Sequence, residues 1–294
     1  MQGKDALGTL NWLVEAGADE AIDEAPINRL AVKNQTEVGI PLTPASPSPE
    51  RGAFDPSRMS TGHARASGAG ISPPKEGRGQ SGDALCDAQA LASAATSLAE
   101  LKAAMEAFDG CALKRTATNT VFADGRPEGR VMFIGEAPGR DEDRIGKPFV
   151  GRAGQLLDKM LASIGLNRDV NAYITNVINW RPPDNRDPSP EEAAMCLPFL
   201  RRHIELANPG VIVLVGAVAA RHVMGITEGI MKSRGRWMEY RVGDRMVPIM
   251  PTLHPAYLLR QPAHKKLAWR DLQALASQLE KLGLPATGAR NFGA

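Results

Sequence analysis

The stretch GVIVLVG, residues 210–216, decides the fold, because every residue between its two glycines is apolar. A strand that is apolar at every position has no polar face to turn toward water, so it is buried on both faces. Strands of this kind occur in parallel sheets that are covered by helices. Three further segments have the apolar character of strands: residues 130–137, 171–179 and 246–255.

Segments with helical periodicity alternate with these strands. They are residues 97–108, 152–165, 190–207, 217–224 and 265–282. The third has a clear start signal, since Ser189 can cap it, Pro190 suits its first turn and Glu192 completes a capping box. The alternation of strand and helix predicts an α/β protein, a three-layer α/β/α sandwich with a central four-stranded parallel sheet.

The N-terminal third of the chain has a different composition. Residues 40–95 are dense in Pro, Ser and Gly, which predicts a disordered linker. Residues 1–39 before it are predicted to hold a short helical segment, either a frayed helix or a peptide that docks on a partner protein. The catalytic domain is then expected over 96–285, followed by a tail at 286–294.

The charge is unevenly distributed along the 294 residues, although the net charge is only +2. Residues 1–95 carry 8 Lys and Arg against 12 Asp and Glu, whereas residues 96–294 carry 27 against 21. The basic excess of the folded part weakly favours a polyanionic partner. No apolar run approaches the ~20 residues that span a bilayer, and the first residues do not read as a secretory signal. We therefore expect a cytoplasmic protein without a membrane segment.

Polar residues follow three of the four predicted strands. Glu136 follows the first, Asn176 ends the second, and His254 follows the last. Ligands of parallel α/β sheets bind beyond the carboxyl ends of the strands, so these residues should meet in one crevice. The loop 135–139 has neither of the glycine patterns that bind phosphates. Phe149 is either a core residue or a stacking platform for a planar ligand.

Each of these residues also has a purely structural interpretation. Glu136 could be a loop carboxylate satisfied by neighbouring amides, Asn176 a turn-former, and His254 a structural histidine before a proline. The prediction of a functional site depends on their convergence at one edge of the sheet.

Three long motifs occur in a fixed order: GEAPGRDEDRIGKPFVGRAGQLLDKML at 135–161, YITNVINWRPPDNRDPSPEE at 173–192 and HPAYLLRQP at 254–262. They resemble the three signature blocks of the family 4 uracil-DNA glycosylases, and the resemblance covers roughly residues 105–280. It implies an enzyme that flips deoxyuridine out of DNA and hydrolyses its N-glycosidic bond, leaving an abasic site in base excision repair. It supplies no lysine nucleophile, which implies a monofunctional glycosylase; we expect a monomer.

The resemblance also implies roles for single residues. Glu136 assists the departure of uracil or orients water, and His254 stabilises negative charge on uracil O2. The substrate-binding set is Ala137 through its backbone N–H, Glu142 crowding the C5 position, Phe149 stacking on the base and Asn176 reading its polar edge. The DNA-binding set is Leu258 or Leu259 as a wedge, with Arg260, Lys265 and Lys266 on phosphates.

The chain departs from the family pattern at the iron-sulfur cluster, which relatives bind through four cysteines. Cys111 and Cys196 match two of them, but Lys114 and Trp180 stand where the other two are expected. The third cysteine of the chain, Cys86, falls in or near the predicted linker. Four thiolates from one chain are therefore impossible. We predict that the cluster is lost, that the chain binds no metal or cofactor, and that Trp180 fills the space.

Three other functions remain open. One is a protein that binds DNA with uracil or another deaminated base and has weak glycosylase activity, or activity shifted to hypoxanthine or xanthine. A second is a protein that traps abasic DNA on a histidine, but the segment 181–192 has no histidine-bearing insertion. A third is an interaction protein whose N-terminal segment tethers an inactive glycosylase fold.

Overall fold

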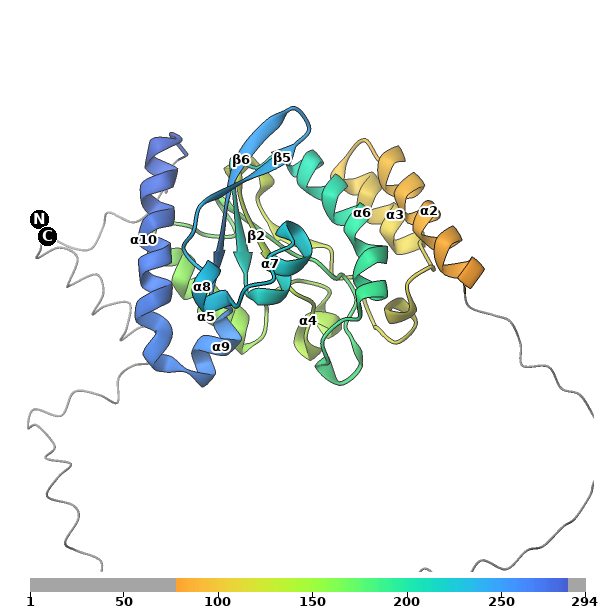
Figure 1. The fold of residues 1–294 in the computed structure, drawn as a ribbon, viewed down its shortest axis with the longest axis horizontal. Coiled ribbons are helices and arrows are strands. Elements are labelled where there is room, and N and C mark those ends of the chain that lie inside the picture. The colour runs from red at the N-terminus through yellow and green to blue at the C-terminus, as the bar shows by residue number, and fades with distance from the viewer. Residues whose placement is uncertain (1–77, 285–294) are drawn as a thin grey trace, which may run out of the picture. The chain divides into compact units, whose positions relative to one another are not determined.

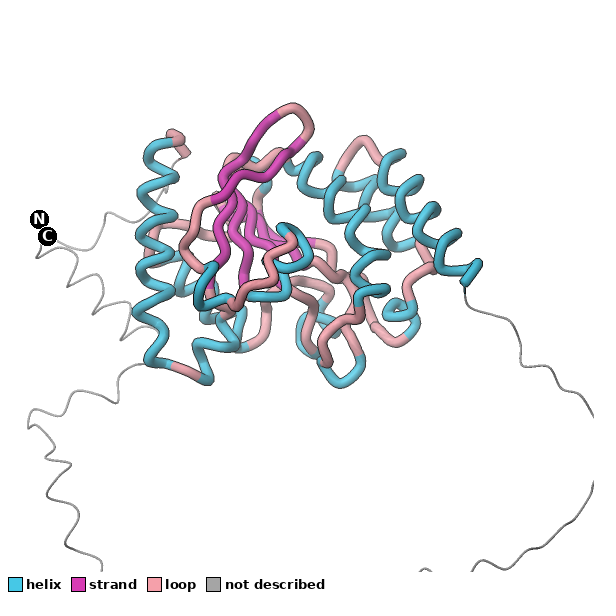
Figure 2. Tube along the Cα trace, viewed as in Figure 1, coloured by secondary structure: helices cyan, strands magenta, loops and turns pink. Residues whose placement is uncertain are grey.

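The computed structural model of the chain describes residues 78–284, which form one six-stranded sheet covered by helices (Figures 1 and 2). The strands are β1 (Ala123–Gly125), β2 (Val131–Gly135), β3 (Ala172–Asn176), β4 (Val211–Val215), β5 (Met238–Val242) and β6 (Arg245–Thr252). The helices are α2 (Arg78–Ala94), α3 (Leu98–Ala107), α4 (Arg140–Ile145), α5 (Arg152–Ala162), α6 (Pro190–Ala207), α7 (Ala217–Met224), α8 (Ile230–Ser233), α9 (Pro255–Arg260) and α10 (Lys265–Lys281).

The sheet has the order β1-β3-β2-β4-β6-β5, and its four central strands are all parallel. This confirms the predicted α/β class and the parallel character of the four apolar strands. The predicted strand number is corrected, because β1 and β5 pair antiparallel at the two edges and make the sheet mixed. The carboxyl ends of β2, β3 and β6 lie at the same edge of the sheet.

The two edge strands escaped the sequence analysis for physical reasons. β1 has only three residues, one of which is a glycine, so it carries no apolar pattern. β5 alternates exposed and partly buried residues and ends on the buried Val242, as a strand with one solvated face does. A two-residue turn at Gly243 and Asp244 connects it to β6, and Gly-Asp between strand-like segments is a recognisable hairpin signal.

Successive residues of the central strands face two separate hydrophobic cores. In β2, Met132 and Ile134 pack into one core, whereas Val131 and Phe133 pack into the other. Buried residues of α2, α3, α6 and α7 complete the first core, and those of α5, α9 and α10 complete the second. Figure 1 shows α10 and the α2, α3, α6 group on opposite sides of the sheet. The predicted three layers are therefore present.

Helix α2 corrects the boundary of the predicted linker. Its residues were assigned to the disordered segment 40–95, whose sequence is rich in Pro, Ser and Gly. The helix nevertheless forms, since Ala88 and Ala92 are buried in the core that α2 shares with α3 and α6. The rest of that linker, the N-terminal segment 1–39 and the tail 286–294 lie outside the described residues.

Helix α6 begins as its sequence predicts. The Ser189 side chain accepts a hydrogen bond from the Glu192 backbone N–H, and the Glu192 carboxylate accepts one from the Ser189 N–H at 2.7 Å. The capping box is therefore confirmed. Within residues 78–284, none of the helices combines the length and apolar composition that a membrane span requires.

Candidate active site

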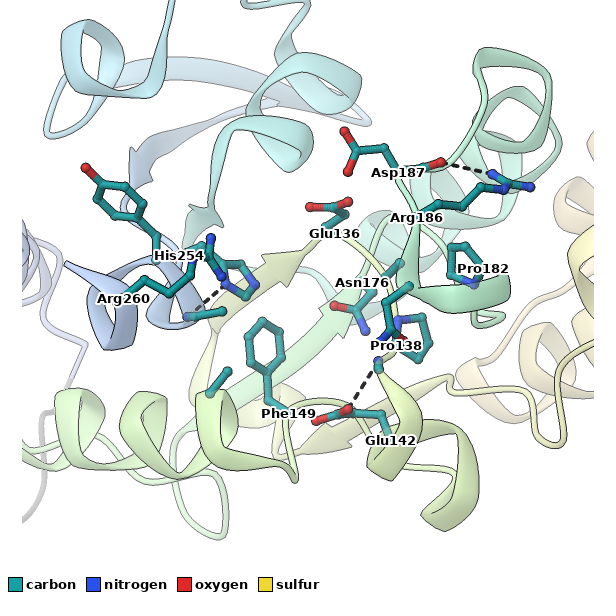
Figure 3. A pocket seen from close by; sticks show the side chains of 16 residues that line it. Glu136, Pro138, Glu142, Phe149, Asn176, Pro182, Arg186, Asp187, His254 and Arg260 are labelled. Atoms are coloured by element: carbon teal, nitrogen blue, oxygen red, sulfur yellow. Dashed lines mark hydrogen bonds between the residues drawn. The ribbon is translucent and has the colours of Figure 1, made fainter. Parts of the chain in front are cut away.

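The loops that follow β2, β3 and β6 surround a pocket of about 520 Å³ (Figure 3). Glu136 lies directly after β2, Asn176 is the last residue of β3, and His254 comes two residues after the end of β6. All three side chains line the pocket, together with Phe149 from the segment before α5. The predicted convergence of these residues is therefore observed.

His254 is held in a single orientation by the helix that it caps. It is the N-cap residue of α9, and its Nδ1 accepts a hydrogen bond from the Ala256 backbone N–H at 3.1 Å. A neutral imidazole whose Nδ1 accepts must carry its proton on Nε2. Burial lowers the pKa of His254 to about 4, and the positive charge of Arg260 acts in the same direction. At neutral pH the ring is thus an uncharged Nε2–H donor.

Room for His254 depends on a glycine at the end of β4. A Cβ on Gly216 would come within 3.1 Å of the His254 Cβ, and the glycine has a φ of +102°. Both the close approach and the left-handed φ favour glycine at this position.

Glu136 has a strongly perturbed carboxyl group. Burial and, to a smaller extent, the negative charge of Asp187 raise its pKa to about 7, against the opposing positive charge of Arg221. A carboxyl group with a pKa near neutrality can both accept and hold a proton under physiological conditions. Perturbed carboxyl groups in a cleft are typical of catalytic sites.

Phe149 and Asn176 form one wall of the pocket. A Cβ on Gly135 would come within 2.5 Å of both the Asn176 amide oxygen and the Phe149 ring, so only glycine permits their close packing. Phe149 has a φ of +53°, which is uncommon for a large side chain. Its ring centroid lies 5.6 Å from that of His254. The ring is therefore fixed beside the amide and the imidazole.

The Glu142 carboxylate fixes the segment that carries Phe149. One of its oxygens accepts hydrogen bonds from the backbone N–H groups of Val150 and Gly151 at 2.9 and 2.8 Å. The other accepts from the Gly139 N–H at 3.1 Å. Glu142 lines the pocket as predicted, and it also connects the loop after β2 with the start of α5.

The resemblance implies that Glu142→Gly opens space at C5 of the base, and the hydrogen bonds of the Glu142 carboxylate predict a second effect. We expect both thymine acceptance and a loss of thermal stability, because three backbone N–H groups lose a charged acceptor. Glu142→Gln is the matched control, since its amide oxygen can keep part of these bonds while the side-chain volume is unchanged. Thymine and uracil release, measured beside the melting temperature, separates the two effects. Thymine acceptance by Glu142→Gln as strong as that by Glu142→Gly would contradict a steric role.

The predicted DNA-contacting residues divide into accessible and buried ones. Leu259 is 38% exposed, whereas Leu258 is fully buried in the core, so only Leu259 is accessible to act as the predicted wedge. Arg260 and Lys266 are exposed, and Arg260 also lines the pocket. Lys265 is 3% exposed, which makes its predicted phosphate contact wrong. The residue is buried at the start of α10.

Sequence reasoning missed several residues that line the pocket. Tyr257 comes from α9, and its hydroxyl lies 2.6 Å from His264 Nδ1. Pro182, Arg186 and Asp187 come from the loop between β3 and α6. The loop bears four charged residues within the second motif, but nothing in the sequence shows which of them line the pocket.

The residues at the position of the family's iron-sulfur cluster do not fit that group. Cys111 and Cys196 are buried and their thiols form a hydrogen bond with each other. The amino group of Lys114 is bonded to the Asp109 carboxylate at 2.8 Å. Trp180 is 1% exposed and packs in the core that contains both cysteines. A four-iron, four-sulfur cluster takes four thiolates, and this site offers two.

No group of three or more His, Cys, Asp or Glu residues suited to a metal ion occurs in the described part of the chain. The Trp180 indole N–H donates to the Thr120 hydroxyl at 3.0 Å, so the ring is anchored as well as packed. Cys86 is exposed on α2.

Comparison with known proteins defines the class of protein, a DNA glycosylase. The family model of the uracil DNA glycosylase superfamily matches residues 122–273. A type-4 uracil-DNA glycosylase of Thermotoga maritima is 42% identical over 176 residues, which are 59% of this chain and 90% of the relative. One from Archaeoglobus fulgidus is 44% identical over 156 residues, 52% of this chain and 78% of the relative. One from Sulfurisphaera tokodaii is 38% identical over 184 residues, which are 61% of this chain and 83% of the relative.

The chain belongs to the uracil-DNA glycosylase superfamily and, within it, to the type-4 uracil-DNA glycosylases.

Proposed function

We propose that this chain excises uracil from DNA by hydrolysing the N-glycosidic bond of a flipped deoxyuridine. The observation that carries the proposal is the pairing, in one pocket, of a carboxyl group with a pKa of about 7 and a neutral imidazole that donates from Nε2. Cleavage of this bond produces a cation-like sugar and a uracil anion. The two groups have the chemistry to stabilise these two charges.

The flipped base stacks on Phe149, and the side-chain amide of Asn176 pairs with its polar edge. The Ala137 backbone N–H donates to a uracil carbonyl. As the C–N bond breaks, its electron pair moves to uracil, and the Nε2–H of His254 donates to O2. A hydrogen bond made only as this charge develops lowers the barrier rather than the energy of the bound substrate.

Water completes the reaction at C1′ of the sugar. Glu136, in its ionised form, stabilises the positive charge of the sugar and takes the proton of the water as the new C–O bond forms. The products are free uracil and an abasic site. No lysine occurs among the described residues that line the pocket, which supports a monofunctional enzyme without a covalent imine.

Duplex contacts come from the exposed residues beside the pocket. Leu259 fills the gap that the flipped nucleotide leaves in the stack, and Arg260 and Lys266 hold the neighbouring phosphates.

We also propose that the chain folds and works without an iron-sulfur cluster. Metal and sulfide analysis of protein purified without oxygen tests this, and a stoichiometric cluster would refute it. The monomeric state, the cytoplasmic location and a protein partner for residues 1–39 stay predictions from the sequence.

Single-turnover cleavage of a labelled oligonucleotide with one uracil tests the proposed activity. We expect uracil-dependent strand scission only after alkaline treatment, and no reaction with thymine. Scission without alkali would contradict the monofunctional mechanism. Tight uracil-dependent binding without any release, or preferential release of hypoxanthine, would replace uracil excision by one of the alternative functions.

The raised pKa of Glu136 also predicts a pH-dependent cost to stability. The folded protein holds the Glu136 proton up to about pH 7, whereas the unfolded chain releases it near 4.5. As far as Glu136 is concerned, the free energy of unfolding is therefore highest below pH 4.5, and it falls as the pH rises through 7. We expect Glu136→Gln to be more stable than the wild type at pH 8 by roughly 1–2 kcal/mol, after allowance for solvent screening, and much closer to it at pH 5. Denaturant unfolding at both pH values measures this, and an equal difference at both would contradict it.

A further inference from the structure

The loop between β3 and α6 places a second carboxylate beside Glu136. Figure 3 shows the carboxylates of Glu136 and Asp187 on the same side of the pocket, with Asp187 reaching in from this loop. Asp187 is exposed and Glu136 is partly buried. The two residues come from different motifs, and only the fold brings them together.

The position of Asp187 is fixed by the charged residues around it. Arg186 forms two hydrogen bonds with the Glu192 carboxylate, at 2.6 and 2.8 Å, and a third with the Asp187 carbonyl at 2.9 Å. Glu192 in turn accepts from the Ser189 backbone N–H at the start of α6. A bidentate Arg–carboxylate pair is a geometrically specific contact. The loop is therefore attached to the helix on both sides of Asp187.

The other charged groups near Glu136 are either occupied or of opposite sign. Glu142 is bonded to three backbone N–H groups, and Arg186 is paired with Glu192. Arg221 from α7 acts on Glu136 in the opposite sense to Asp187. The ring of His254 is uncharged at neutral pH, and Arg260 lies in the part of the pocket that holds this ring (Figure 3). Asp187 is thus the negative charge with the largest effect on Glu136.

We propose that Asp187 is a positioning residue for the reaction, whose carboxylate acts through Glu136 and makes it a stronger base toward the water that attacks the sugar. The inference rests on the proposed function and deepens it. The water loses one O–H bond, its oxygen bonds to C1′, its proton goes to Glu136, and the electron pair of the C–N bond leaves with uracil. A neighbouring negative charge favours the protonated form of Glu136 and so increases its affinity for this proton.

The test is the pH dependence of single-turnover uracil release by Asp187→Asn. We expect the acidic limb of the profile to move to lower pH than in the wild type, because Glu136 ionises more readily without its neighbour. We also expect about a threefold slower rate on the plateau, since a weaker base takes the proton less effectively. A residue that only maintains the loop would lower the rate without moving the limb.

Asp184→Asn is the matched control. Asp184 lies in the same loop and is exposed, but it does not line the pocket. Its φ of +53° is one that asparagine tolerates. The variant loses the same charge, so it reports any general effect of loop charge on DNA binding. It should keep the wild-type profile.

A second measurement does not depend on activity. Carboxyl NMR titration of Glu136 in the free protein should give a lower pKa in Asp187→Asn than in the wild type and in Asp184→Asn. Equal Glu136 titrations and equal acidic limbs in all three proteins would overturn the inference. Lack of uracil release by the wild type would instead overturn the proposed function, while the NMR titration would still decide whether the two carboxylates interact.

Discussion

His254→Ala should slow single-turnover uracil release by about 10²- to 10³-fold, which is the usual cost of removing one donor from an oxyanion site. The reason is the fixed tautomer of the ring. Because Nδ1 is occupied by the Ala256 N–H, the Nε2–H points its proton at the pocket before the substrate arrives. No reorganisation is needed as charge develops on uracil, and the loss should fall on the chemical step rather than on DNA binding.

The same variant removes the cap of α9, which costs about 1 kcal/mol of stability. His254→Asn is the matched control, because asparagine caps helices well. We expect it to restore most of the melting temperature without restoring the rate.

A neutral imidazole above pH 4 also predicts that the rate profile of the wild type has no step near pH 6.5 from this ring. A wild-type rate of uracil release by His254→Ala would show that the imidazole does not stabilise the charge on uracil.

Trp180→Ala should be the most destabilising single change, with a loss of about 3–5 kcal/mol in the free energy of unfolding. Trp180 is among the largest fully buried side chains, and it packs in the core that contains Cys111 and Cys196. Alanine would leave a large cavity and an unpaired Thr120 hydroxyl. Chemical denaturation measures the loss directly.

Trp180→Phe separates volume from hydrogen bonding at this site. Phenylalanine keeps most of the apolar contact but cannot donate to Thr120, so we expect roughly half of the alanine loss. If Trp180→Ala unfolds at the wild-type denaturant concentration, the ring is not the packing element that we propose in place of a cluster.

The parallel core of the fold could be predicted because its signals are local. Uninterrupted apolar strands such as Val211–Val215, and the capping box at Ser189, are determined by residues close together in the sequence. Glu136, Asn176 and His254 could be placed in one site for the same reason, since each lies at the end of a recognisable strand or within two residues of it.

The remaining features depend on tertiary packing, which local patterns in the sequence do not reveal. Helix α2 follows directly on a Pro, Ser and Gly-rich stretch that hides its start, and it forms because small residues such as Ala88 are buried against other helices. Leu258 and Leu259 are adjacent and alike, and only the packing of α9 decides that the second is exposed. Asp187 lines the pocket because of a loop conformation that the Arg186–Glu192 pair maintains.

The most direct test of the account is whether this pocket itself releases free uracil. The measurement is free uracil and abasic sites, counted together in one time course with uracil-containing DNA, for the wild type and for Glu136→Gln combined with His254→Ala. We predict equal amounts of the two products from the wild type and almost none from the folded double variant. Equal release by the double variant would contradict the account, because the chemistry would then not depend on the carboxyl group and the imidazole described above.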